Sequence, residues 1–292
     1  MLEPVGKTSK IIDSLMKFLF LKLKENEMTI SERRMQKFIF KVKMELGNNH
    51  ELYDKLPYYW YFHGPFSELV RDSFNEITSA YCSTHNHISY ILNGIYEDFN
   101  EILDIFPNLN KIANNIIKDK DSFYKNLIEL VYKEYAPYKI LYPFRYNIYK
   151  IADDYESLQS LDTDNYINQF YDCESLLPEE DYFLKFSDIY SQFATNLDLI
   201  NDNDNLIDNW QILRKPIINL WETFTSGVRV NHKDKYYNNN VFEWNNEFNL
   251  RIDNLALVVD KTEHYINHKN FCNQYSSTQK NILNSTIGTY LR

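Results

Sequence analysis

The chain has 292 residues, a formal net charge of -10 and a composition that is 44% hydrophobic and 16% aromatic. This length allows one large or two ordinary domains, and the hydrophobic content is normal for a globular protein with a sizeable core. Because an acidic chain repels phosphate, the charge argues against broad, non-specific binding of nucleic acid. Only 6 glycines and 8 prolines are present, and tight turns depend on these residues, so we expect a mainly α protein with long helices.

The first two predicted helices lie before residue 48. Apolar residues recur at three- and four-residue spacing over residues 8–25, which is the pattern of an amphipathic helix. A second helix is expected to begin after Ser31, a good N-cap residue, and to end at Gly47. Its predicted buried face consists of Met35, Phe38, Ile39, Val42 and Leu46.

An aromatic segment, LPYYWYFHGPF at residues 56–66, follows the second helix. Rings pack well on a pleated surface, so Tyr58 to Phe62 are expected to form a short buried strand. Gly64 and Pro65 would make the turn into a third helix. Residues 87–94 alternate in polarity and are predicted to form a second strand that pairs with the first.

The remainder of the chain is predicted to be helical with short connections. Helices are expected at residues 96–106, 108–117 and 122–135, and long apolar stripes follow from residue 183 onward. Pro216 is expected to kink one of these long helices. The prediction is therefore a helical domain over residues 1–140, with a small two- or three-stranded β element, and a bundle of long helices over residues 141–292.

Two groups of histidines and cysteines have ligand types that suit zinc. CSTHNH carries the first group, and the second group falls at i, i+4 and i+8, on one face of a predicted helix. Neither group has an evident fourth ligand, and a glutamate precedes rather than follows the first histidine of the second group, so the metalloprotease pattern is not met. We treat them as weak metal candidates, with ordinary surface histidines as the alternative: Cys82, His85, His87, His264, His268 and Cys272.

Signatures of common enzymes are absent from the sequence. There is no glycine-rich phosphate loop and no GxSxG elbow. No catalytic residue and no cofactor is therefore predicted. The opening residues lack a secretory cleavage site and no run reaches the length of a membrane span, which leads us to expect a cytoplasmic protein with reduced thiols.

Two motifs in the first third of the chain carry a family resemblance. Met35-Gln36-Lys37-Phe38-Ile39-Phe40 is followed, after a spacer, by Tyr61-Phe62-His63-Gly64-Pro65-Phe66-Ser67. Their order and spacing resemble the opening of the Panacea (SocA-like) antitoxin domain and of related YwgA-type phage-associated proteins. The resemblance covers roughly residues 8–95, although the spacer is long and the region that could form a β-wing is short.

The resemblance implies a non-catalytic module that binds and regulates a partner protein, such as a toxin or a defence effector. An acidic C-terminal half could mask a basic partner. The alternative is a winged-helix-like DNA-binding regulator over residues 31–94, whose basic helix would meet phosphate. Oligomerisation is left open. The candidate partner-binding residues are Arg33, Arg34, Lys37, Tyr61, His63 and Phe66.

Overall fold

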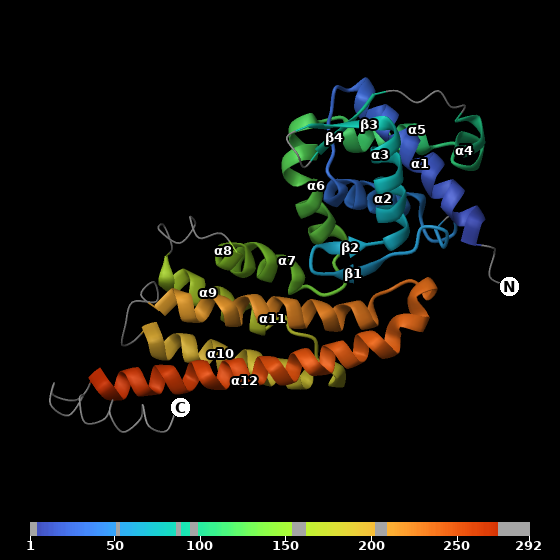
Figure 1. Ribbon diagram of the computed structural model, residues 1–292. Helices are drawn as coiled ribbons and strands as arrows, with labels where there is room; N and C mark the ends of the chain where they lie inside the picture. Colours follow the sequence, from blue (N-terminus) through green and yellow to red (C-terminus); the bar gives the residue numbers. More distant parts are fainter. Residues whose placement is uncertain are drawn as a thin grey trace. The chain divides into compact units, whose positions relative to one another are not determined.

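The computed structural model describes residues 5–50, 53–85, 89–93, 99–153, 162–201 and 209–273 and is mainly α, as the sequence predicts (Figure 1). The chain divides into two compact units. Unit 1 comprises residues 1–137 together with 228–242, and unit 2 comprises residues 138–227 together with 243–292. The predicted boundary at residue 140 lies close to the first division. However, the prediction missed the return of residues 228–242 to unit 1.

Unit 1 is built around helix α2, which packs against α3, α5 and α6, while α1 packs against α3. Of the apolar face predicted for α2, Met35, Phe38, Ile39 and Val42 are buried, whereas Leu46 is half-buried. Ser31 occupies the N-cap position and Gly47, with a φ of 78°, follows the last residue. The described helices of this unit are α1 (Val5–Glu25), α2 (Glu32–Leu46), α3 (Glu68–Tyr81), α4 (Asn100–Ile105), α5 (Leu109–Ile117) and α6 (Lys120–Tyr135).

Two antiparallel hairpins complete the first segment of unit 1. Strand β1 (Tyr59–Tyr61) pairs with β2 (Gly64–Phe66), and β3 (Cys82–His85) pairs with β4 (Ser89–Leu92). The predicted strand at the aromatic segment is thus confirmed. The expectation that residues 87–94 pair with it was wrong, because β4 pairs with β3. The part of that prediction on residues 87–88 and 94 lies outside the described residues.

Residues 228–242 cover the second edge of β1. The Trp60 amide donates to the His232 carbonyl at 3.0 Å, and the Asp234 amide donates to the Tyr58 carbonyl at 2.8 Å. A single β-bridge joins Tyr59 to Lys233. Since β2 occupies the other edge, backbone groups on both edges of β1 are hydrogen-bonded.

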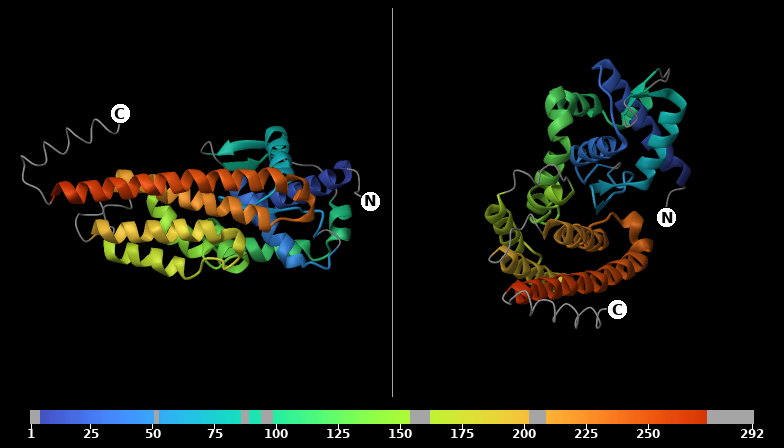
Figure 2. Two further views of the ribbon diagram at one scale, coloured as in Figure 1. Left: turned by 90° about the horizontal axis from the view of Figure 1, so that it is seen from below. Right: turned by 60° about the vertical axis from the view of Figure 1, so that its left-hand side comes forward.

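Long helices form unit 2, and α10, α11 and α12 run side by side (Figure 2). Their apolar stripes meet in a core rich in aromatic rings, in which Phe183 contacts Phe224 and Phe248. Gly227 lies at this contact, and a Cβ there would come within 2.7 Å of both Phe183 and Phe248. The described helices are α7 (Leu141–Pro143), a π-helical turn (Phe144–Tyr149), α8 (Lys150–Asp153), α9 (Thr163–Glu174), a 3₁₀ turn (Asp181–Phe183), α10 (Leu184–Asn201), α11 (Trp210–Asn231) and α12 (Val241–Asn273).

The division between the units falls within helix α11, which contributes its last residues, 228–231, to unit 1. Pro216 lies inside the part of this helix that belongs to unit 2. Within the described residues, no helix combines the length and the apolar character that crossing a bilayer requires.

Candidate functional site

The tip of the β1–β2 hairpin is the first feature to consider, because the aromatic motif folds there. Tyr61 pairs with Gly64, so that Phe62 and His63 form the turn. Gly64 has a φ of 83°, and a Cβ at this position would lie 3.0 Å from Cε2 of Tyr132. Only glycine adopts such a φ readily. The glycine of the motif is therefore required by the backbone and by the close approach of a buried ring.

Helix α2 holds the second strand of this hairpin through two adjacent side chains. Gln36 donates from Nε2 to the Ser67 carbonyl at 2.9 Å and accepts from the Ser67 amide at 3.1 Å. Lys37 donates from Nζ to the Pro65 carbonyl at 2.7 Å. Both side chains are about 1% exposed. The two motifs that carry the family resemblance are thus one structural element, in which side chains of the first bind the backbone of the second.

Aromatic and basic side chains gather at the tip. The rings of Tyr61 and Phe62 stack, with centroids 3.9 Å apart and an interplanar angle of 20°. The buried guanidinium of Arg229 lies 4.3 Å from the centroid of the Tyr61 ring. His63 is exposed, and its Nε2 is 3.4 Å from Nη2 of the exposed Arg33. We define the hairpin-tip surface as Arg33, Tyr61, Phe62, His63 and Phe66.

Phe66 completes this surface from the second strand. It is half-buried, its ring lies 5.8 Å from that of Tyr59, and the guanidinium of Arg71 lies 5.7 Å from its centroid. Behind it, the Tyr59 hydroxyl donates to Oε1 of Glu68 at 2.7 Å. Burial and this carboxylate together raise the pKa of Tyr59 well above its usual range. The phenol is thus a fixed hydrogen-bond donor that supports the surface.

Two of the predicted partner-binding residues on α2 are engaged inside unit 1. Lys37, as described above, is buried and leaves the candidate set. Arg34 is half-buried, donates to the Tyr124 carbonyl at 3.0 Å and lies over the Tyr124 ring. Lys41 pairs with Glu134 at 2.7 Å. A basic residue on a predicted helix suggests an exposed charge, but this helix is covered on several sides.

Lys43 is a further buried cation of α2. Its Nζ donates to Oδ2 of Asp234 at 2.5 Å and to the Leu56 carbonyl at 2.8 Å. The same Asp234 oxygen accepts from the Tyr58 amide at 2.6 Å. Burial lowers the pKa of Lys43 in spite of the neighbouring carboxylate. This pair fixes residues 228–242 to β1 and α2.

A cavity of about 280 Å³ borders the aromatic segment on this side, lined by rings that include Tyr58 and Trp60. One acid, Asp234, and one imidazole, His232, also line it. Because the carboxylate of Asp234 is already bound to Lys43 and to the Tyr58 amide, the lining does not bring together a pair of acids for proton transfer.

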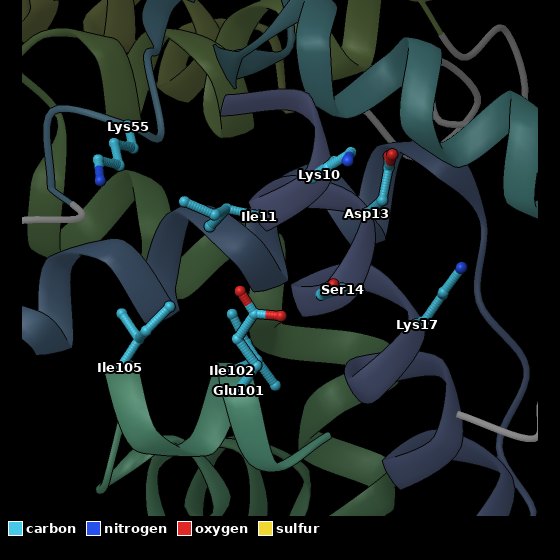
Figure 3. A pocket seen from close by; sticks show the side chains of 9 residues that line it. All are labelled: Lys10, Ile11, Asp13, Ser14, Lys17, Lys55, Glu101, Ile102 and Ile105. Carbon is cyan, nitrogen blue, oxygen red and sulfur yellow. The ribbon is translucent and has the colours of Figure 1, made fainter. Parts of the chain in front are cut away.

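A larger cavity, of about 590 Å³, lies between α1, α4 and the segment before β1 (Figure 3). Its volume is in the range of small-molecule sites. Three lysines and two acids line it, and Oδ1 of Asp13 is buried without a hydrogen-bond partner. The lining side chains are Lys10, Ile11, Asp13, Ser14, Lys17, Lys55, Glu101, Ile102 and Ile105.

The weak metal candidates are only partly described. Cys82 lies in β3 and is half-buried, and burial raises the pKa of its thiol to about 11. His264 and His268 lie on α12. Among the side chains that the structure describes, no three His, Cys, Asp or Glu residues are placed to hold a metal ion. The side chains of His85, His87 and Cys272 lie outside the described part.

Comparison of the chain with family models, with curated proteins and with solved structures gave no match. The antitoxin resemblance therefore stays an expectation drawn from the two motifs.

Several residues that shape this site were not predicted from the sequence. Gln36 belongs to the first motif, but its two hydrogen bonds to the backbone of Ser67 could not be predicted from the sequence. Arg229 and Asp234 come from a segment that reads as a polar loop. The aromatic strand itself could have indicated that such a segment exists. A strand with only one neighbour leaves its other edge unpaired, and proteins normally cover such an edge with another part of the chain.

Proposed function

We propose that this protein is a non-catalytic module that binds and regulates a partner protein, with the hairpin-tip surface as its recognition site. The role would be that of an antitoxin-like or phage-defence component, as the resemblance implies. The observation that carries the proposal is the set of aromatic and basic side chains on a backbone held by Gln36, Lys37 and Gly64. Tyrosine and arginine are enriched among residues that dominate binding energy, and a rigid surface loses less entropy on binding.

The charge distribution supports a basic partner. Unit 2 holds 21 acidic and 11 basic residues, so that it carries a net charge of -10, whereas unit 1 holds 20 of each and is neutral. An acidic unit attracts a basic protein, such as a toxin or a nuclease, and accelerates the encounter. Association is then expected to weaken as salt screens this attraction.

The contacts of α2 weigh against the DNA-binding alternative. That function needs basic side chains that face phosphate. Of the five basic residues of α2, Arg33 is exposed, whereas Lys37 and Lys43 are buried and Arg34 and Lys41 are bound within unit 1. In addition, the β1–β2 hairpin separates α2 from α3, so the two helices are not joined by the short turn of a helix-turn-helix.

Site-specific photo-crosslinking in the native host tests the proposal. A photoreactive phenylalanine analogue replaces His63 in one variant and the exposed Lys111 of α5 in a control. A protein that is captured at position 63 and not at position 111 would be identified by mass spectrometry. Equal capture at both positions, or recovery of DNA alone, would contradict the proposal.

The captured protein is then purified and its affinity measured by calorimetry. His63→Ala and Arg33→Ala are each expected to weaken binding about tenfold, the size of effect typical of residues that contribute to recognition. Lys111→Ala should leave the affinity unchanged. Circular dichroism of each variant confirms that the fold is retained. Unchanged affinity in both tip variants would refute the assignment of the site.

A further inference from the structure

The cavity of about 280 Å³ beside the aromatic segment has the lining of a small-molecule site. All of its described lining residues fall within unit 1, and none of them belongs to the hairpin-tip surface. Ligand pockets are typically lined by aromatic and apolar side chains together with a few polar groups. Five rings line this cavity, namely Phe40, Tyr53, Tyr58, Trp60 and Tyr135. A ligand could therefore be held by unit 1 at a place separate from the proposed recognition surface.

The five rings differ in exposure. Phe40 lies edge-on to three of the others, with centroid distances of 5.2, 5.9 and 6.2 Å. Phe40, Tyr58 and Trp60 are buried, whereas Tyr53 and Tyr135 are half-buried. The two half-buried tyrosines thus offer ring surface at a cavity whose other rings are held in the core of the unit. Aromatic rings pack favourably against one another, so this lining suits a ligand that contains a flat ring.

The charged groups of the lining favour an anion. Lys233 donates from Nζ to the Val230 carbonyl at 2.6 Å, which uses one of the three donors of an ammonium group. Burial lowers the pKa of Lys233, and no carboxylate among the described residues pairs with it. Asp234, the acid in the described lining, is already bound to Lys43 and to the Tyr58 amide. An anionic ligand would supply the counter-charge that Lys233 lacks within the described residues.

A cationic ligand suits the same cavity less well, although aromatic rings attract cations. The ammonium of Lys43 lies 4.1 Å from the centroid of the Tyr53 ring, and that of Lys41 lies 5.4 Å from the centroid of the Tyr135 ring. A ligand cation at either ring would therefore be set beside a like charge, which repels it. The rings and the lysines together select an aromatic anion over an aromatic cation.

We propose that this cavity binds a small aromatic carboxylate, whose ring packs against Tyr53 and Tyr135 and whose carboxylate accepts a hydrogen bond from Nζ of Lys233. The volume of about 280 Å³ is close to the lower end, about 300 Å³, of small-molecule pockets. The ligand is therefore a single ring with a short acidic side chain. Because residues 231–234 and helix α2 both contribute to the lining, a bound ligand stabilises the attachment of residues 228–242 to the rest of unit 1.

Titration of the purified full chain with 4-fluorophenylacetate, followed by fluorine NMR, tests the proposal. The dissociation constant should be about 0.1–1 mM, which a ligand of this size can reach. Lys233→Met should raise it about 10- to 100-fold, because a hydrogen bond to a charged group is lost. Lys235→Met removes an exposed lysine of the same segment and should leave the constant unchanged. Absence of binding up to about 10 mM, or an unchanged constant in Lys233→Met, would overturn the proposal.

A matched cationic probe and hydrogen exchange test the charge preference and the location. 4-Fluorobenzylamine carries an ammonium group in place of the carboxylate and should bind at least about tenfold more weakly. Equal binding of the two probes would refute the selection of an anion. In the presence of 4-fluorophenylacetate, peptides that cover β1 and residues 228–242 should gain protection from hydrogen exchange, while α10 peptides should not. Protection gained elsewhere and not in these peptides would place the ligand at another site and refute the assignment.

Discussion

Replacing Gly64 by alanine perturbs the hairpin where it meets the core of unit 1. Two effects act together at this position. The backbone has a φ of 83°, in a region that side chains rarely adopt, and the added methyl group would lie 3.0 Å from Cε2 of Tyr132 and 3.3 Å from its Cζ. Tyr132 is 1% exposed and packs edge-on against Trp60 at 5.4 Å, so its ring has little room to withdraw.

The two effects can be given separate magnitudes. The backbone strain of a non-glycine residue at such a φ destabilises by about 1–3 kcal/mol. Overpacking against a buried ring adds about 1–3 kcal/mol. Gly64→Ala is thus expected to destabilise unit 1 by about 2–6 kcal/mol in total. Gly47→Ala, at a φ of 78° with no atom within 4 Å of the new methyl group, should show the backbone effect alone.

Hydrogen exchange followed by mass spectrometry is the suitable assay, because a chain of two units need not unfold in one transition. Peptides that cover β1 and α2 report the free energy of opening of unit 1. Gly64→Ala should lower their protection, while peptides from α10 in unit 2 should keep theirs.

A double-mutant cycle isolates the contact with the ring. In a Tyr132→Leu background, Gly64→Ala should destabilise by about 1–3 kcal/mol less than in the native chain, since the crowded atoms are gone. Gly47→Ala should be additive with Tyr132→Leu within about 0.5 kcal/mol. If the Gly64 substitution costs the same in both backgrounds, the close approach to Tyr132 plays no part and the reasoning fails.

Three further predictions concern other contacts. Asp234→Asn leaves the buried ammonium of Lys43 without its counter-charge and should destabilise unit 1 by about 2 kcal/mol near pH 7, less than a fully buried pair because Asp234 is 28% exposed. Because the folded-state pKa of Lys43 is lowered, the folded chain binds fewer protons than the unfolded chain just below pH 10.5. Stability should therefore rise with pH in that window, more steeply in Asp234→Asn, and urea unfolding at pH 9, 9.5 and 10 that gives a flat profile would contradict this. Gly227→Ala forces a methyl group to 2.7 Å from the Phe183 ring and should destabilise unit 2 by about 1–3 kcal/mol, seen as lost protection in α10 and α12 peptides with unit 1 unaffected. Finally, burial raises the pKa of the Cys173 thiol to about 12, so iodoacetamide at pH 8 should modify this residue only after unfolding, and rapid labelling of the native chain would count against its burial.

Local patterns in the sequence predicted much of the fold. The expectation that Gly64 and Pro65 form the turn into a third helix was wrong, because they begin β2 and the turn lies at Phe62 and His63. The apolar spacing, however, located the helices, and the run of rings located β1. Each of these features depends on residues that are close together in the chain, which is why periodicity and turn chemistry suffice.

Features that depend on distant residues were not predicted. The pairing of β4 with β3 rather than β1 is a choice between edges that the strand's own residues do not encode. The burial of Lys37 was missed because lysine is rarely buried unless it is bound, and its acceptor, the Pro65 carbonyl, is a backbone group without a sequence signal. Tyr61 and His63 were named as partner-binding residues. Tyr61 is half-buried and His63 is exposed, and their role in binding a partner stays a prediction.

The return of residues 228–242 to unit 1 has a consequence for synthesis on the ribosome. A nascent chain that has released residues 1–137 still lacks the segment that covers the free edge of β1 and the carboxylate that accompanies Lys43. Residues 138–227 must be translated before that segment emerges. The N-terminal unit thus completes its structure late, after most of the second has been made, and a fragment cut at residue 137 would carry an unsealed strand edge open to mispairing.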